Sequence, residues 1–426
     1  MTERLLQFIW QFQYFNKHEL SLEGEEKERF YIIDPGRYNT HQGPDFLEAR
    51  IKIGHAVWVG HIEIHIRSSD WEKHEHQLDR NYDNVILHVV WENDKNMPGS
   101  RVPVFSLQDR IPKFLLQQYE ELMKSLSFIP CGQKISTIHE LIWCNWKEKL
   151  LVGRLQRKTA MIESYLQQCN MHWEEVFWWM IAKNFGITVN AEAFEAMARS
   201  IPVNLLSKHK NQLNQLEALL FGQTGMLLGK KFTESYPKML QREYKFYQKK
   251  YKLKPIHEPV HLLRMRPVNF PTIRLAQLAV LINESAHLFS QIKETETVAE
   301  LKKMLDVTAN DYWHYHYLFD EETIFQPKKL GSQMAENIII NTMVPMVFAY
   351  GYFHKEQVYK DKAIRWLESI NAEKNAIITR FDQCGIYNKT AFDSQAVIEL
   401  KSQYCDQRRC LDCGVGNALL KGFVDE

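Results

Sequence analysis

The feature that most constrains the fold is a run of alternating apolar and polar side chains from Val57 to Arg67. Its apolar positions are Ile62, Ile64 and Ile66. Side chains of a β-strand point to opposite faces in turn, so this spacing predicts a strand with one buried face. The residues on the other face are His61, Glu63 and His65. A carboxylate between two imidazoles on a strand needs solvent, an ion pair or a metal ion.

Two more strands are predicted around this run. Alternating apolar residues predict one strand after Asp45, and the apolar run Val85–Trp91 predicts another. The segment Asp70–Tyr82, which carries His74 and His76, is predicted to be a helix or an irregular turn. We therefore expect a sheet that gathers acidic residues and histidines within about fifty residues of sequence.

Length and periodicity predict two domains. A chain of 426 residues exceeds what one hydrophobic core usually holds. Strand signals are confined to the first part of the chain, and beyond residue 140 the apolar residues recur at helical spacing. The predicted architecture is α+β, with a mixed-sheet α/β domain over residues 1–130 and a larger all-helical domain over residues 131–426.

Charge and motif content restrict the functional classes. The formal net charge is +1, so binding of nucleic acid would require a local basic patch. The sequence contains no glycine-rich phosphate-binding loop and no nucleophile elbow, which argues against an ATPase and a serine hydrolase. It also shows no signal peptide and no apolar run of membrane length, so we expect a cytoplasmic protein without a membrane partner. The sequence leaves the oligomeric state open.

Three interpretations of the acidic and histidine residues remain. Asp45 and Glu63 favour a hard cation, Mg²⁺ or Mn²⁺, which would lower the pKa of bound water and offset charge on phosphate oxygens. That chemistry suits phosphodiester hydrolysis. A second interpretation is a site for Zn²⁺, Mn²⁺ or Fe²⁺ formed by His61, Glu63 and His65, with His74 or His76. In the third, these side chains simply line the wet face of a half-exposed sheet.

The order of these elements resembles the core of the PD-(D/E)XK nuclease superfamily, through Pro44-Asp45 and Glu63-Ile64-His65. The resemblance implies a restriction-endonuclease-like sheet in which Asp45 and Glu63 hold a divalent cation together with the carbonyl of Ile64. His65 stands where the superfamily has Lys, which activates water or contacts the scissile phosphate. A neutral imidazole can act as a base but offers the phosphate no permanent charge.

Cysteines near the C-terminus form a second cluster of candidate ligands: Cys405, Cys410 and Cys413. Their spacing is typical of zinc and iron–sulfur sites, which usually have four ligands. Cys384 or Cys131 would supply the fourth thiolate. The cluster also resembles nucleases of the same superfamily that hold a four-iron cluster with one distant and three C-terminal cysteines. Zn²⁺, an iron–sulfur cluster and buried free thiols remain the alternatives.

A basic run with interleaved tyrosines lies in the predicted helical domain. The residues that we expect to contact nucleic acid are Lys245, Lys249, Lys250, Lys252, Arg264, Arg266 and Arg274. Basic side chains contact phosphates and aromatic rings stack on unpaired bases, so DNA or RNA is the predicted partner. The alternative is a solvated helix face whose tyrosines turn into the core.

Over nearly its full length the chain resembles a bacterial family of proteins of unknown function, through the strings GPDF, IEIH with SSDW, FGQTG, RPVNFPTIRLAQLA, DSQ and YC-x4-CLDC. That resemblance implies no activity. The residues themselves predict a metal-dependent nuclease with Asp45, Glu63 and His65 as catalytic residues. The alternatives are a catalytically inactive nucleic-acid-binding or scaffold protein with a nuclease-like fold, and a transition-metal protein that uses the strand with His and Glu.

Overall fold

The computed structural model describes residues 1–24, 28–95, 102–262, 266–285 and 287–422. The chain forms two compact units, each with its own interior. Unit 1 comprises Met1–Trp146, Gln383–Ile386 and Leu400–Glu426, and unit 2 comprises Lys147–Asp382 and Tyr387–Glu399. The structure confirms the α+β class, with a mixed sheet in the N-terminal part followed by helices. The predicted division at residue 130 differs from these units, because the C-terminal cysteines belong to unit 1.

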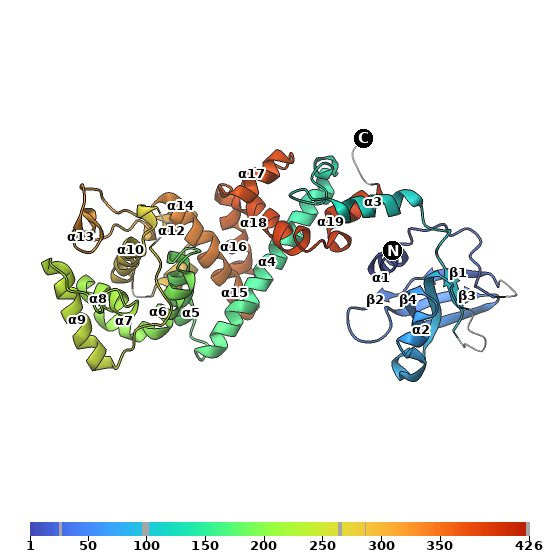
Figure 1. The fold of residues 1–426 in the computed structure, drawn as a ribbon, viewed down its shortest axis with the longest axis horizontal. Coiled ribbons are helices and arrows are strands. Elements are labelled where there is room, and N and C mark those ends of the chain that lie inside the picture. Colours follow the sequence, from blue (N-terminus) through green and yellow to red (C-terminus); the bar gives the residue numbers. More distant parts are fainter. Residues whose placement is uncertain (25–27, 96–101, 263–265, 286, 423–426) are drawn as a thin grey trace. The chain divides into compact units, whose positions relative to one another are not determined.

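Unit 1 is built on a mixed sheet, which has six strands within the described residues (Figure 1). They are β1 (Phe30–Asp34), β2 (Arg37–Tyr38), β3 (Phe46–Ile53), β4 (Ala56–Arg67), β5 (Val85–Glu92) and β6 (Val104–Ser106). The order is β1-β3-β4-β5-β6, and β2 also pairs with β3. β3 is antiparallel to β1 and β4, whereas β5 is parallel to both β4 and β6.

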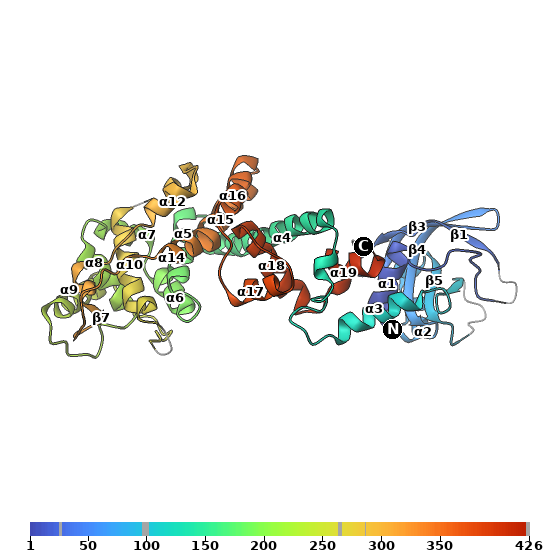
Figure 2. The ribbon, with the colours of Figure 1, turned by 90° about the horizontal axis from the view of Figure 1, so that it is seen from above.

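The central strand β4 is covered on both faces along its second half. Ile62 and Ile64 are fully buried on one face, but Glu63 and His65 are also only 6% and 2% exposed on the other. The first helix, α1 (Glu3–Phe12), packs against β4 (Figures 1 and 2). It lies on the isoleucine face, because its Trp10 contacts Phe105, which is in register with Ile64 across β5. The short helix α2 (Asp70–Lys73) packs against the same strand and covers the Glu63 face. The polar face is thus an interior surface.

Aromatic side chains show that the sheet curls until its outer strands meet. The rings of Phe30 in β1 and Phe105 in β6 lie 5.0 Å apart, although these strands stand at opposite ends of the order. Trp10 of α1 is fully buried, stacks on Phe15 at 5.7 Å and lies 6.4 Å from Phe105. One helix therefore fills the inside of the curl with a continuous aromatic core.

The remaining helices of unit 1 come from both ends of the chain. Helix α3 (Lys113–Lys124) packs against the last helix, α19 (Gly414–Lys421). The turn before α19, η7 (Cys410–Asp412), contacts α1, and Asp412 forms an ion pair with Arg4. The C-terminal segment is therefore part of the packing of unit 1.

In its described residues, unit 2 is helical with one short hairpin of β7 (His316–Leu318) and β8 (Glu321–Glu322). Its helices are α4 (Glu140–Gln168), whose first turns belong to unit 1, α5 (Trp173–Phe185), α6 (Ala191–Ser200), α7 (Val203–His209), α8 (Leu213–Gln223), α9 (Ser235–Tyr251), α10 (Pro271–Glu284), α11 (Leu288–Glu294), α12 (Val298–Met304), α13 (Asp311–His314), α14 (Ser332–Ile338), α15 (Val344–Phe353), α16 (Gln357–Ser369), α17 (Ala376–Gln383) and α18 (Ala391–Glu399). None of the helices in the described part of the chain has the length and apolar character needed to cross a membrane.

Gly60 of β4 provides a test of the sheet packing. A Cβ atom at this position would lie 2.4 Å from the backbone oxygen of Asn84, which accepts a hydrogen bond from the N–H of His61. We expect Gly60→Ala to lower the free energy of unfolding by about 1–3 kcal/mol, because neither backbone segment can move freely. Denaturant titration measures the change. The matched control is Val59→Ala, at an exposed neighbouring position, and an equal loss in both variants would contradict the packing argument.

Candidate metal centre

Asp45 and Glu63 lie opposite each other where β3 begins. The backbone N–H of Asp45 donates to Oε2 of Glu63 at 3.0 Å, and the N–H of Ile64 donates to Oδ2 of Asp45 at 3.1 Å. Gln7 of α1 donates to Oδ1 of Asp45 at 2.8 Å. A bulge in β3, where Glu48 has a left-handed φ of 61°, shifts the register beside this pair. The structure therefore brings the two predicted acids together.

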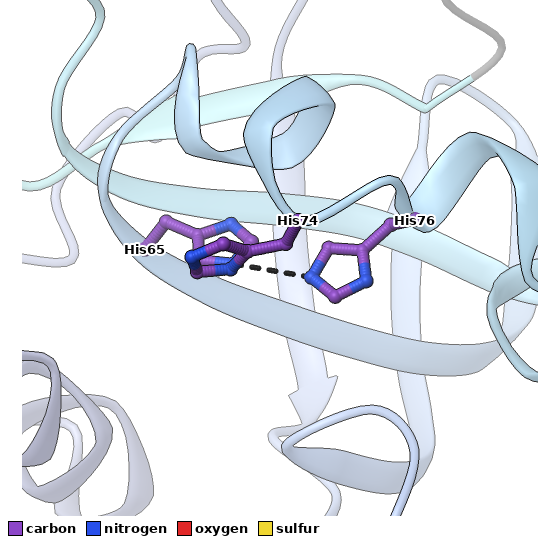
Figure 3. Close-up of side chains that lie close together, drawn as sticks. All are labelled: His65, His74 and His76. Atoms are coloured by element: carbon purple, nitrogen blue, oxygen red, sulfur yellow. Dashed lines mark hydrogen bonds between the residues drawn. The ribbon is translucent and has the colours of Figure 1, made fainter.

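Three imidazoles, of His65, His74 and His76, converge at β4 (Figure 3). Nε2 of His65 lies 3.1 Å from Nδ1 of His74 and 3.3 Å from Nε2 of His76. Oε1 of Glu63 lies 3.6 Å from Nε2 of His65 and 3.5 Å from Nε2 of His76. His65 is buried, whereas His74 is exposed, so the group has a side open to solvent.

A tight turn after α2 directs both loop histidines toward β4. His74 caps the C-terminal end of α2, and Glu75 takes a left-handed conformation with φ 58° before His76 begins the short helix η1 (His76–Leu78). Trp71 of α2 packs against His76 with ring centroids 5.4 Å apart, and Tyr82 stacks on His76 at 3.9 Å. Aromatic packing thus holds the His76 ring in place.

Burial controls the charge of this group. Loss of solvation and, to a smaller extent, the negative charge of Asp45 together raise the pKa of Glu63 to about 9. Burial also raises the pKa of Asp45 to about 6 and lowers that of His65 to about 2. At neutral pH the His65 ring is therefore neutral and keeps a lone pair for a cation. A bound cation would return Glu63 to its ionised form, because opposite charge favours the carboxylate.

The spacing of the three imidazole nitrogens fits a transition-metal ion, and Oε1 of Glu63 lies close to two of them. A tetrahedral Zn²⁺ with bonds of about 2.0 Å places its ligand atoms roughly 3.3 Å apart. Nε2 of His65 lies 3.1 Å from Nδ1 of His74, 3.3 Å from Nε2 of His76 and 3.6 Å from Oε1 of Glu63. Imidazole nitrogens with one carboxylate oxygen suit Zn²⁺, Mn²⁺ or Fe²⁺ better than Mg²⁺. We refer to Glu63, His65, His74 and His76 as the histidine–glutamate group.

Comparison with known proteins identifies the family. The family described as "Protein of unknown function (DUF2851)" matches residues 3–376. The chain belongs to the DUF2851 family. No curated protein and no solved structure matches this DUF2851 chain.

Other predicted site residues of the DUF2851 chain lie apart from the histidine–glutamate group. Nδ1 of His61 accepts a hydrogen bond from the N–H of Glu48 at 3.4 Å, so its ring faces β3. Ile64 is buried, and in β4 it stands between the two proposed ligands Glu63 and His65. The cysteines are placed in unit 1, where Cys384 is half-buried and the following are buried: Cys131, Cys405, Cys410 and Cys413.

The predicted nucleic-acid contacts divide into exposed and buried residues. The exposed ones are Lys245, Lys249, Lys250, Lys252 and Arg266. Arg274 is 6% exposed within α10 and donates hydrogen bonds to Asn269 and Gln277, so it adds no surface charge. Arg264 lies outside the described residues. Tyr244 and Tyr247 of α9 are buried, so the predicted stacking surface is reduced.

His88 and Gln7 extend the site beyond the predicted ligands. Nε2 of His88 lies 2.9 Å from Nδ1 of His65, which fixes the orientation of the His65 ring. The parallel register aligns His88 with Glu63, but sequence alone does not reveal that register. Gln7 is 38 residues from its partner Asp45, and no local pattern signals their contact.

The raised pKa of Glu63 predicts a pH-dependent stability in metal-free protein. The folded-state pKa of about 9 exceeds the reference value of 4.5, so protonation of Glu63 stabilises the folded state. This stabilisation is lost as the pH rises toward 9. Between about pH 6.5 and 8.5, the free energy of unfolding of wild-type protein should fall by up to about 1 kcal/mol per pH unit more than that of Glu63→Gln. Urea unfolding in the presence of a chelator measures both slopes.

The lowered pKa values of His65 and His88 do not confound this comparison. Their contribution is lost only as pH falls below the reference value of 6.5. His61→Gln serves as the control and should keep the wild-type slope. Identical slopes for wild type and Glu63→Gln would contradict the burial of a proton on Glu63.

Proposed function

We propose that this DUF2851 protein is a metal-dependent hydrolase of nucleic acid, with its cation held by the histidine–glutamate group. The observation that carries the proposal is the convergence of three imidazole nitrogens within 4.8 Å of one another, with Oε1 of Glu63 3.5–3.6 Å from two of them. A second acid, Asp45, lies directly beside Glu63. The order of the secondary-structure elements and the positions of the two acidic residues resemble the PD-(D/E)XK pattern. This resemblance supports phosphodiesters as the substrate class.

In this proposal the acids and imidazoles have separate roles. A bound transition ion lowers the pKa of a coordinated water and offsets negative charge on the phosphate. Asp45, with a pKa raised to about 6, is the general base, because a base works best when its pKa lies near the working pH. His65 is a ligand rather than the base, since both of its ring nitrogens face other ring nitrogens.

The exposed lysines of α9 and its C-terminal cap support a polyanionic substrate. Lys245, Lys249, Lys250 and Lys252 are exposed, whereas the tyrosines between them turn inward. Contacts to phosphates therefore fit this surface better than base stacking. A cytoplasmic location is part of the proposal, and the cysteines support it because all seven are free thiols.

A second candidate function is a different reaction at a transition metal. Three imidazoles in the group favour it, because PD-(D/E)XK chemistry uses oxygen ligands and hard cations. A metal-bound protein that leaves DNA and RNA intact under every divalent ion tested would favour this second function.

Purified protein supplied with Mn²⁺ or Zn²⁺ should cut DNA or RNA. Glu63→Gln and His76→Ala should each lower the rate more than about 100-fold, because a lost metal ligand removes several kcal/mol of transition-state stabilisation. Asp45→Asn should lower kcat while metal content is unchanged. Gel assays and elemental analysis measure both quantities.

The matched control for these variants is His61→Ala, which removes an imidazole from the same strand but from outside the group. It should keep both activity and metal. If Glu63→Gln cut nucleic acid at the wild-type rate with an unchanged melting temperature, the assignment of Glu63 as a metal ligand of the hydrolase would be contradicted.

Binding of nucleic acid should depend on the α9 lysines. The double variant Lys249→Ala, Lys250→Ala should reduce the slope of log Kd against log salt by about 1.5. Each phosphate contact that is lost lowers the number of counterions released on binding. The control is Lys355→Ala with Lys389→Ala, two exposed lysines elsewhere in unit 2. Equal slopes for both double variants would exclude this helix as the binding surface.

A further inference from the structure

Cysteines from distant parts of the sequence meet inside unit 1. Cys131 lies in the turn after α3, and Cys405 ends the π-helical segment η6 (Leu400–Cys405). Cys410 begins η7, and Cys413 precedes α19. All four side chains are at most 9% exposed. Single π-helical turns are rare and concentrate at functional sites.

The electrostatic environment shows that these thiols are close neighbours. Burial raises the pKa of Cys131, and the thiols of Cys413 and Cys410 raise it further. Burial likewise raises the pKa of Cys405, and Cys131 and Cys413 add to this effect. The segment after α3 and the C-terminal segment therefore place these buried thiols near enough to interact electrostatically.

Hydrogen-bond donors surround the sulfur of Cys413. The backbone N–H groups of Val415 and Gly416, at the start of α19, face it and favour the thiolate. The indole N–H of Trp146 also lies beside this sulfur, and its buried nitrogen has no oxygen or nitrogen acceptor within the described residues. N–H groups directed at sulfur are a feature of metal-bound cysteines, because they stabilise the ligand charge.

Two glycines allow the backbone around these thiols to pack closely. A Cβ at Gly416 would lie 2.1 Å from the backbone oxygen of Cys410, and a Cβ at Gly414 would lie 2.7 Å from the ring of Trp146. Neither backbone could keep its position with a larger residue. The turn from Cys410 to Gly416 is therefore shaped around the thiols and the indole.

The spacing of the sulfur atoms distinguishes a single ion from a cluster. A tetrahedral zinc ion with Zn–S bonds of about 2.3 Å would place its thiolates roughly 3.8 Å apart. Within the described residues, only the three histidines of unit 1 have ligand atoms all within 4.8 Å of one another, and no three cysteines do. An iron–sulfur cluster holds its thiolates on separate iron atoms and therefore farther apart.

We propose that Cys131, Cys405, Cys410 and Cys413 bind an iron–sulfur cluster that joins the C-terminal segment to the rest of unit 1. Cys384 is left out of the ligand set, because it is only half-buried, whereas the other four cysteines are buried. The cluster shares no residue with the histidine–glutamate group, so this proposal is independent of the hydrolase.

The test is the composition of full-length protein purified without oxygen and without chelators. We expect iron and acid-labile sulfide in equal amounts, with a broad visible absorption band. Reconstitution with ferrous iron and sulfide should restore both in protein that has lost them. Protein that holds zinc at the cysteines, or that takes up neither iron nor sulfide, would overturn the proposal.

Variants locate the cluster. Cys131→Ser and Cys410→Ser should lose the visible band and the sulfide, whereas Cys384→Ser and the exposed-site control Cys144→Ser should keep them. Circular dichroism monitors the folding of each variant. Where a variant unfolds, the uptake of iron and sulfide by wild-type protein on reconstitution still tests the proposal. Loss of the band in Cys384→Ser would overturn the ligand set.

Glu63→Gln separates the two metal sites. This variant should keep full sulfide and visible absorption, because the ligand it loses belongs to the histidine–glutamate group. Iron that disappears in Glu63→Gln but persists in Cys131→Ser would place the iron at the histidines and overturn the cluster.

Discussion

Unit 1 depends on the burial of a carboxylate beside a second carboxylate and among neutral imidazoles. Burial holds the pKa of Glu63 at about 9 and that of His65 at about 2, so the group carries little charge by itself. Such an arrangement is costly to bury unless a partner compensates for the lost solvation. A divalent cation would compensate for the lost solvation, since it favours an ionised Glu63 and accepts the imidazole lone pairs.

The sheet supplies the geometry for this group. β4 continues past the start of β3, so Glu63 and His65 lie where an antiparallel neighbour ends and a parallel neighbour continues. Helix α1 fills the opposite face, and its Gln7 reaches Asp45. The turn at Glu75 brings the loop imidazoles over the same strand. Rigid secondary structure thus holds two ligands, and a short, aromatic-packed turn holds the other two.

Local patterns predicted much of the fold, and long-range contacts account for what they missed. The alternation in β4 correctly separated Ile62 and Ile64 from Glu63 and His65, and the helical periodicity expected beyond residue 140 agrees with α4, which begins at Glu140. Alternation also grouped His61 with Glu63, but its ring bonds to Glu48 beside a bulge that no sequence rule located. The meeting of Cys131 with the C-terminal cysteines, and their membership of unit 1, depend on contacts between residues far apart in sequence.

The composition of unit 1 has a consequence for synthesis on the ribosome. Helix α19 and the turn before it pack on α3 and α1, so the N-terminal unit lacks part of its interior until the last segment has been translated. Nearly all of unit 2 leaves the exit tunnel before that segment does. A nascent chain must therefore keep its first 146 residues competent for folding while a larger helical body forms, which gives chaperones a long interval in which to act.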